Sequence, residues 1–210
     1  MTFETWIAFV IASSVLLMIP GPTILLVMSY AISKGRSVAI ASAAGVALGD
    51  LVAMSASLAG LGALVLASAT AFTALKWVGA IYLIYLGTKL LLSAKEESIA
   101  LPDAAQSVTP RGVFAHAAAV TALNPKSIAF FIAFVPQFIR HEAAFLPQVS
   151  VLIATFVTLA TLNALAYALL ADRLRSFFSQ PKALVWMTRT GGATLIAMGF
   201  FTATLKRTSP

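Results

Sequence analysis

The sequence predicts an all-α, polytopic membrane protein with six transmembrane helices, arranged as two inverted three-helix repeats. Of its 210 residues, 60% are hydrophobic and only 10% are charged, whereas about a quarter of the residues in a soluble domain are charged. The apolar residues also fall into six runs, each near the roughly 20 residues that a helix needs to cross a bilayer. Proline breaks recur at the same place in the first and fourth runs, which is typical of inverted repeats in transporters.

Composition excludes several classes of protein. The mean hydropathy of +0.95 excludes an ordinary soluble domain. The net charge of +7 comes from Lys and Arg scattered between apolar runs, a distribution that indicates membrane orientation rather than nucleic-acid binding. The chain has no Cys, so disulfides, thiolate metal sites and cysteine nucleophiles are excluded.

The six predicted helices share an apolar composition without the alternation expected of a transmembrane β-strand. Because backbone polar groups in lipid must be satisfied within the segment, a helix is expected for each run. Their ranges are 5–33, 38–66, 72–92, 112–138, 147–171 and 183–205. Residues 1–210 then form a single transmembrane domain, with halves 1–92 and 112–210 joined by a polar linker, 93–111. The first run follows Glu4 without a basic stretch, so we expect it to stay in the mature protein.

The loops carry the orientation signal. More Lys and Arg lie in the loops after the first, third and fifth segments than in the others, and such an excess marks the cytoplasmic side. We therefore expect both termini outside, although two basic residues near the C-terminus oppose this orientation. The residues on the predicted cytoplasmic side are Lys34, Arg36, Lys89, Lys95, Arg111, Arg173, Arg175 and Lys182, against Lys76, Arg140, Lys206 and Arg207 on the other.

Two helices are predicted to break inside the membrane. Proline removes a backbone donor and disfavours helical geometry in the residue before it, so breaks are expected before Pro22 and before Pro125. Each break also resembles a helix start, because Asn124 is a good N-cap for a helix beginning at Pro125 and Gly21 precedes Pro22 in the same way. The competing interpretation is a pair of proline kinks that only shape packing.

Asp50 is an acidic residue inside the second predicted helix. An ionisable group there marks an ion, proton or substrate route by default, although a carboxylate that only ties helices together is the alternative. At about 1.5 Å per helical residue, Pro22, Asp50 and Asn124 lie at depths of roughly 16 to 20 Å, so they can surround one cavity. Gly45 and Gly49 form a GxxxG motif before Asp50 and predict close approach of another helix.

Three further polar residues lie within predicted helices. Lys126 would place its ammonium beside a helix start and form a positive site for an anion; a lysine that snorkels to the interface is the alternative. Asn163, with Tyr167 one turn later, is an interior polar pair that fits either a site or helix-to-helix bonding. Neither histidine has the neighbours of a metal site, and no catalytic motif is present, so we assign no metal, cofactor or catalytic residue.

Four motifs together resemble the LysE/RhtB family of amino-acid exporters. They are "PGP" (20–22), "GVALGD" (45–50), "LKWVGAIYLIYLG" (75–87) and "NPKS" (124–127), and their order extends the resemblance over the whole chain. The resemblance implies a six-helix bacterial inner-membrane protein that exports amino acids or close derivatives, such as homoserine, its lactone, threonine, leucine or basic amino acids, driven by the proton gradient. The motif positions carried over are Pro20, Gly21, Pro22, Gly49, Asp50, Asn124, Pro125 and Lys126.

These observations lead to one hypothesis and three competing ones. A zwitterionic substrate would place its carboxylate near the helix starts and Lys126, and its ammonium, or a coupling proton, would meet Asp50. Rocking of two bundles would then open the site to each side in turn. Scarce acidic residues and the lack of Cys argue against a metal-cation exporter or channel. An intramembrane enzyme would need a nucleophile and a base together, and Asp50 is the one carboxylate found within a predicted helix. A non-transporting scaffold would leave Asp50 and Lys126 without a reason beyond packing. The expected partners are a small substrate and the lipid bilayer, without nucleic acid; a homo-oligomer stays open.

Overall fold

Within the residues that it describes, the computed structural model is helical and has no strand. These residues are 1–19, 21–34, 36–67, 69–93, 109–140, 143–171 and 181–204. The helices are α1 (Phe3–Met18), α2 (Pro22–Lys34), α3 (Arg36–Ala67), α4 (Ala69–Ser93), α5 (Pro110–Ala122), α6 (Pro125–Ala129), the π-helix η1 (Phe130–Phe134), the 3-10 helix η2 (Val135–Phe138), α7 (Phe145–Leu169) and α9 (Pro181–Thr204). The predicted all-α class is confirmed for this part of the chain.

Some predicted features lie outside the described residues. They are Pro20, most of the 93–111 linker, and the loop and tail positions Lys95, His141, Arg173, Arg175, Lys206 and Arg207.

The helices are long enough to cross a membrane in two to four places. Val38–Gly62 of α3 and Phe145–Leu169 of α7 each qualify alone, and two bent pairs of helices qualify if each pair is one span. Among the described residues of α4, Trp77–Leu92 forms a shorter apolar stretch. The prediction of spanning helices is therefore confirmed for up to four segments of the described chain.

Both predicted helix breaks are present. Helix α1 ends at Met18 and α2 begins at Pro22, with an angle of 58° between their axes. Helix α5 ends at Ala122 and a new helix begins at Pro125, at 41°. The second start has the expected cap, because the side chain of Asn124 accepts a hydrogen bond of 3.0 Å from the Lys126 amide.

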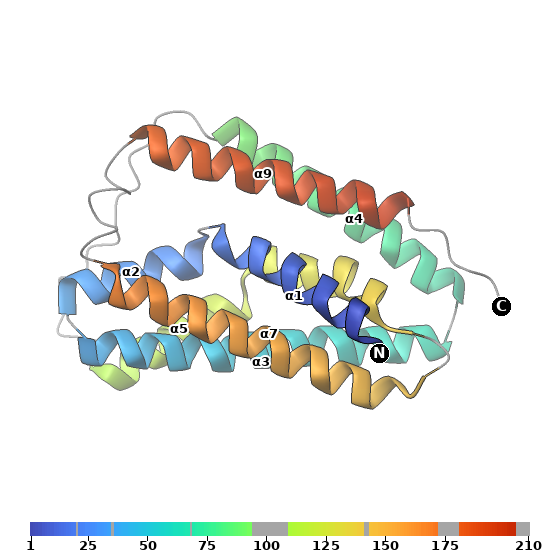
Figure 1. Ribbon diagram of the computed structural model, residues 1–210, viewed down its shortest axis with the longest axis horizontal. Helices are drawn as coiled ribbons and strands as arrows, with labels where there is room; N and C mark the ends of the chain where they lie inside the picture. The colour runs from blue at the N-terminus through green and yellow to red at the C-terminus, as the bar shows by residue number, and fades with distance from the viewer. Residues whose placement is uncertain are drawn as a thin grey trace.

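The helices lie lengthwise between two ends of the molecule (Figure 1). The start of α1 and the end of α9 lie at the same end, and α4 and α9 lie side by side as a layer above the rest. A Cβ added to Gly87 would lie 2.5 Å from the Gly192 carbonyl oxygen, and one on Gly192 would lie 2.6 Å from that of Gly87. The α4–α9 pair therefore depends on close backbone contact, the packing typical of small residues in membrane helices.

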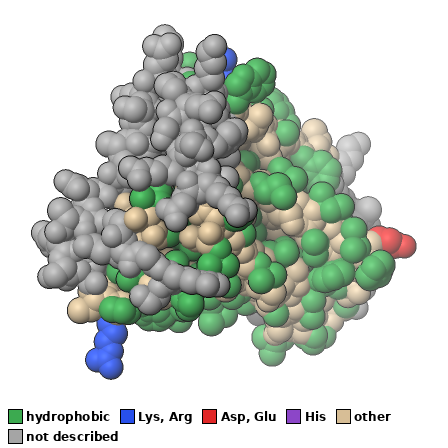
Figure 2. All heavy atoms as spheres, turned by 60° about the vertical axis from the view of Figure 1, so that its left-hand side comes forward, with side chains coloured by type: hydrophobic (Ala, Val, Ile, Leu, Met, Phe, Trp, Pro, Cys, Tyr) green, Lys and Arg blue, Asp and Glu red, His purple; other side chains and the backbone are tan. Residues whose placement is uncertain are grey.

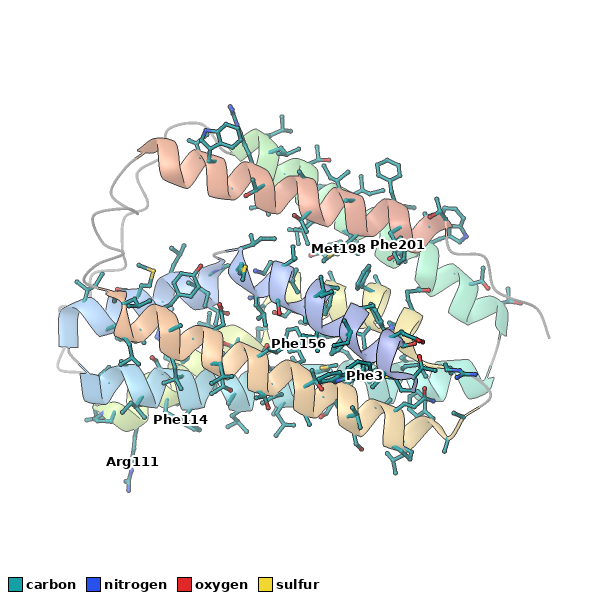
Figure 3. All side chains as sticks on the ribbon, viewed as in Figure 1. Phe3, Arg111, Phe114, Phe156, Met198 and Phe201 are labelled. Carbon is teal, nitrogen blue, oxygen red and sulfur yellow. The ribbon has the colours of Figure 1, made fainter. Side chains whose placement is uncertain are left out.

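The interior contains a cluster of aromatic rings, and the surface is largely apolar. Phe9, Phe130, Phe131 and Phe156 are fully buried where α1, η1 and α7 meet. Figure 3 shows Phe156 inside the bundle and Arg111 projecting away from it at the start of α5. In the part of the surface that Figure 2 colours by type, hydrophobic side chains are widespread and few charged ones appear. Such a surface suits a lipid environment.

Candidate functional site

A small cavity lies between the two broken helices. Its volume is about 30 Å³, which is room for one or two water molecules. This volume is too small to hold an amino acid. Its wall combines apolar side chains with polar ones from α2, α3, α5, α6 and α7, namely Thr23, Asp50, Thr121, Asn124, Lys126, Ser127 and Asn163.

Asp50 is the acidic group of this wall. It is only 3% exposed, and no side chain or backbone group in the described ranges forms a hydrogen bond with it or an ion pair within 4.0 Å. A buried carboxylate without a partner is costly. The Lys126 ammonium is the described charge that acts on Asp50.

The GxxxG motif positions Asp50 against the second half of the chain, as predicted. A Cβ added to Gly49 would lie 2.6 Å from the Ala118 carbonyl oxygen and 2.6 Å from the Thr121 Cβ. Gly45 approaches the backbone of α5 in the same way, one turn earlier. At Gly45 and Gly49 the backbones of α3 and α5 are in close contact, so Asp50, the next residue of α3, lies beside the end of α5.

Asn124 connects the two breaks. Its Nδ2 donates to the Thr23 Oγ1 at 3.1 Å, while its Oδ1 caps α6. The Thr121 hydroxyl also donates to Thr23, at 3.4 Å. All three side chains are buried, so a polar contact joins the first turn of α2 to the break after α5.

Lys126 caps a helix other than its own. Its Nζ donates to the carbonyl oxygens of Leu16, at 3.2 Å, and Ile19, at 2.8 Å, at the end of α1. A cation at that position stabilises the negative end of the helix dipole. Lys126 thus points across the cavity and does not snorkel. Its charge and that of Asp50 act on each other there.

The polar pair predicted in α7 supports the same helix end. Asn163 Nδ2 donates to the Leu17 carbonyl oxygen at 3.0 Å, and the Tyr167 hydroxyl donates to that of Met18 at 3.0 Å. The last four carbonyls of a helix have no donor in the regular hydrogen-bond pattern of that helix, so donors outside it are needed. Together with Lys126, α7 supplies a donor to each carbonyl from residue 16 to residue 19.

The predicted site residues fall into two groups. Asp50, Asn124, Lys126, Asn163 and Gly21 line the cavity. Pro22 and Pro125 do not; their side chains are exposed, and their contribution is to begin the helices that follow.

Sequence reasoning missed three polar wall residues, Thr23, Thr121 and Ser127, as well as the apolar part of the wall. The available signal was spacing, because Thr23 directly follows Pro22 as Lys126 follows Pro125, and Thr121 and Ser127 each lie three residues from Asn124. A small hydroxyl beside a predicted break is a candidate lining residue on that basis.

In the described ranges, no three His, Asp or Glu side chains come together as a metal ion would need. The titratable groups of the cavity are one carboxylate and one ammonium. This pair complements a molecule that carries both charges.

Comparison with known proteins gives a consistent result. A family model described as "LysE type translocator" matches residues 14–206. The chain is 34% identical to a homoserine/homoserine lactone efflux protein of Salmonella typhimurium, over 98% of this chain and 99% of that protein. It is 28% identical to a leucine efflux protein of Salmonella choleraesuis, over 91% and 90%, and 31% identical to an uncharacterized membrane protein of Vibrio cholerae, over 98% and 100%. No solved structure matches.

Proposed function

The chain belongs to the LysE family of translocators, and we propose that it exports amino acids or close derivatives across the bacterial inner membrane. It is a membrane transporter rather than an enzyme, since the family consists of translocators and the named relatives are efflux proteins. Homoserine, homoserine lactone and leucine, which appear in the names of those relatives, are the first substrates to test; threonine and basic amino acids come next.

The observation that carries this proposal is a buried carboxylate, Asp50, and an ammonium, Lys126, in the wall of one cavity. A free amino acid has an ammonium and a carboxylate on one carbon, so it can satisfy Asp50 with the first and Lys126 with the second. Asp50 is the one acidic side chain in the described wall. A zwitterion with a neutral side chain therefore fits better than a basic amino acid, which needs a second acidic partner.

The proposed mechanism is alternating access with two inverted halves and six spans. Three features support it: each half begins with a broken helix, the two breaks meet at one cavity, and the third helices of the halves, α4 and α9, pack together. Broken helices at corresponding places mark the binding site in transporters of this kind. Asp50 would carry the coupling proton when the substrate is absent. Both termini would lie outside, since the start of α1 and the end of α9 lie at the same end of the molecule (Figure 1).

The test is efflux from loaded membrane vesicles with an imposed proton gradient. We expect the parent protein to export labelled L-homoserine or L-leucine. Asp50→Asn keeps the shape of the side chain and removes its charge, so proton-driven export should fall at least about tenfold, the effect of losing roughly 1.4 kcal/mol. Glu4→Gln is the matched control, because Glu4 is exposed at the start of α1. Undiminished export by Asp50→Asn would contradict the role of Asp50.

A further inference from the structure

The end of α1 at the first break is held by side chains from the other half of the chain. We propose that Lys126 is a two-position switch: in the closed form it caps α1, and the carboxylate of an entering amino acid draws it away and frees that helix end. This inference rests on the proposed export of amino acids, and it assigns to one residue both the recognition of the carboxylate and the opening of the cavity.

The size of the cavity requires one wall to move. An amino acid does not fit into about 30 Å³. The wall formed by α3 and α5 is closely packed, since a Cβ on Gly49 would already lie 2.6 Å from Ala118 and Thr121 atoms. Another wall is the end of α1, with Leu16 and Leu17, which Gly21 follows after the break. The end of α1 is held by side-chain donors that bond its last carbonyls. Such a donor can leave one acceptor for another at little net cost.

The ammonium of Lys126 can make that exchange. Its acceptors at the end of α1 share only about half of a negative charge, whereas a carboxylate carries a full one and forms the stronger charge-assisted hydrogen bond. One side of the ammonium also faces Gly21, where a Cβ would lie 3.4 Å from Nζ. Because glycine has no side chain, the cavity reaches Lys126 at this point.

Departure of Lys126 changes the end of α1 in a defined way. The Leu16 carbonyl keeps a hydrogen bond of 3.3 Å from the Ile19 amide. Among described groups, the Ile19 carbonyl has only Lys126 as its donor. Tyr167 and Asn163 still hold Met18 and Leu17, so they act as positioning residues that limit how far the helix end moves. Water would then reach the break through the position that Lys126 leaves.

The absence of Cys from the chain allows a direct test. Leu16 is 1% exposed and lines the cavity, so a Leu16→Cys variant in vesicles should react slowly with N-ethylmaleimide. We expect L-homoserine or L-leucine to accelerate labelling, and their decarboxylated analogues, 3-aminopropan-1-ol and isopentylamine, to leave the rate unchanged. Equal acceleration by an amine and its parent amino acid would overturn the switch.

Variants test the Lys126 clamp, meaning its two hydrogen bonds to the end of α1, separately from the proposed transport. Adding Lys126→Met should raise the labelling rate about tenfold without any ligand, because two charge-assisted hydrogen bonds are lost, and amino acids should raise it no further. Tyr167→Phe should give a smaller rise that still responds to amino acids. Lys89→Met, at an exposed lysine of α4, is the matched control. A Lys126→Met rate equal to that of the control overturns the clamp whether or not export occurs. If vesicles export none of homoserine, homoserine lactone, leucine, threonine and the basic amino acids, the proposed function fails, and the ligand-free rates still decide the clamp.

Discussion

Replacement of Gly49 by Ala should separate α3 from α5. The new Cβ would lie 2.6 Å from the Ala118 carbonyl oxygen and from the Thr121 Cβ, and ordinary contact begins at 3.4 Å, so the helices must shift by roughly 0.8 Å. Overpacking of this kind costs about 1–3 kcal/mol. Because the displaced Thr121 lines the cavity beside Asp50, export should fall together with the free energy of unfolding.

The same helix contains the control for this prediction. Nothing lies within 4 Å of a Cβ added at Gly60, so Gly60→Ala makes the same chemical change in α3 without a collision. Thermal unfolding in detergent should show Gly49→Ala losing several degrees of Tm, and Gly60→Ala matching or exceeding the parent. If the two variants unfold at the same temperature, the close approach of α3 and α5 is not as described.

Three further predictions concern stability and can use the same unfolding assay. Gln148→Ala should lower the free energy of unfolding by about 1–3 kcal/mol. The Oε1 of this buried side chain accepts from the amide of residue 140, and its Nε2 donates to the carbonyls of residues 140, 143 and 144. No loss of stability would mean that these three residues keep their places without the side chain. Phe130→Ala should cost about 3–5 kcal/mol, since the ring is fully buried, whereas Phe200→Ala, with a ring 58% exposed, should cost much less; similar losses would refute the aromatic core. A double-mutant cycle with Tyr30→Phe and His116→Ala should give a coupling of about 0.5–1.5 kcal/mol for their 2.8 Å hydrogen bond between α2 and α5, and additive effects would exclude it.

Much of the fold was predictable from local chemistry. Apolar runs located the helices, and proline located both breaks to within a few residues, because its missing amide acts on the adjoining turn. Asn124 was recognisable as an N-cap for the same local reason. The π-helix Phe130–Phe134 was not predicted. Its first ring, Phe130, packs against Phe9 of α1 and Phe156 of α7, and such long-range packing leaves no periodic signal in the sequence.

The candidate site was predictable in its members more than in its contacts. Asp50, Asn124 and Lys126 were identified one at a time, since an ionisable or amide group in an apolar run stands out. The acceptors of Lys126 lie more than a hundred residues away at the end of α1. Only the folded chain brings α1 and α6 together, so the sequence indicated a positive group at this place but not the helix end that it caps.

The glycine contact between α4 and α9 also sets an order for biosynthesis. Gly87 and Gly192 are about a hundred residues apart, and ribosomes add roughly 5–20 residues per second. For some 5 to 20 seconds after α4 is made, the helix that covers its glycine face does not yet exist. The first half of the nascent chain therefore waits in the membrane with its third helix uncovered, and synthesis of the last helix completes both halves at once.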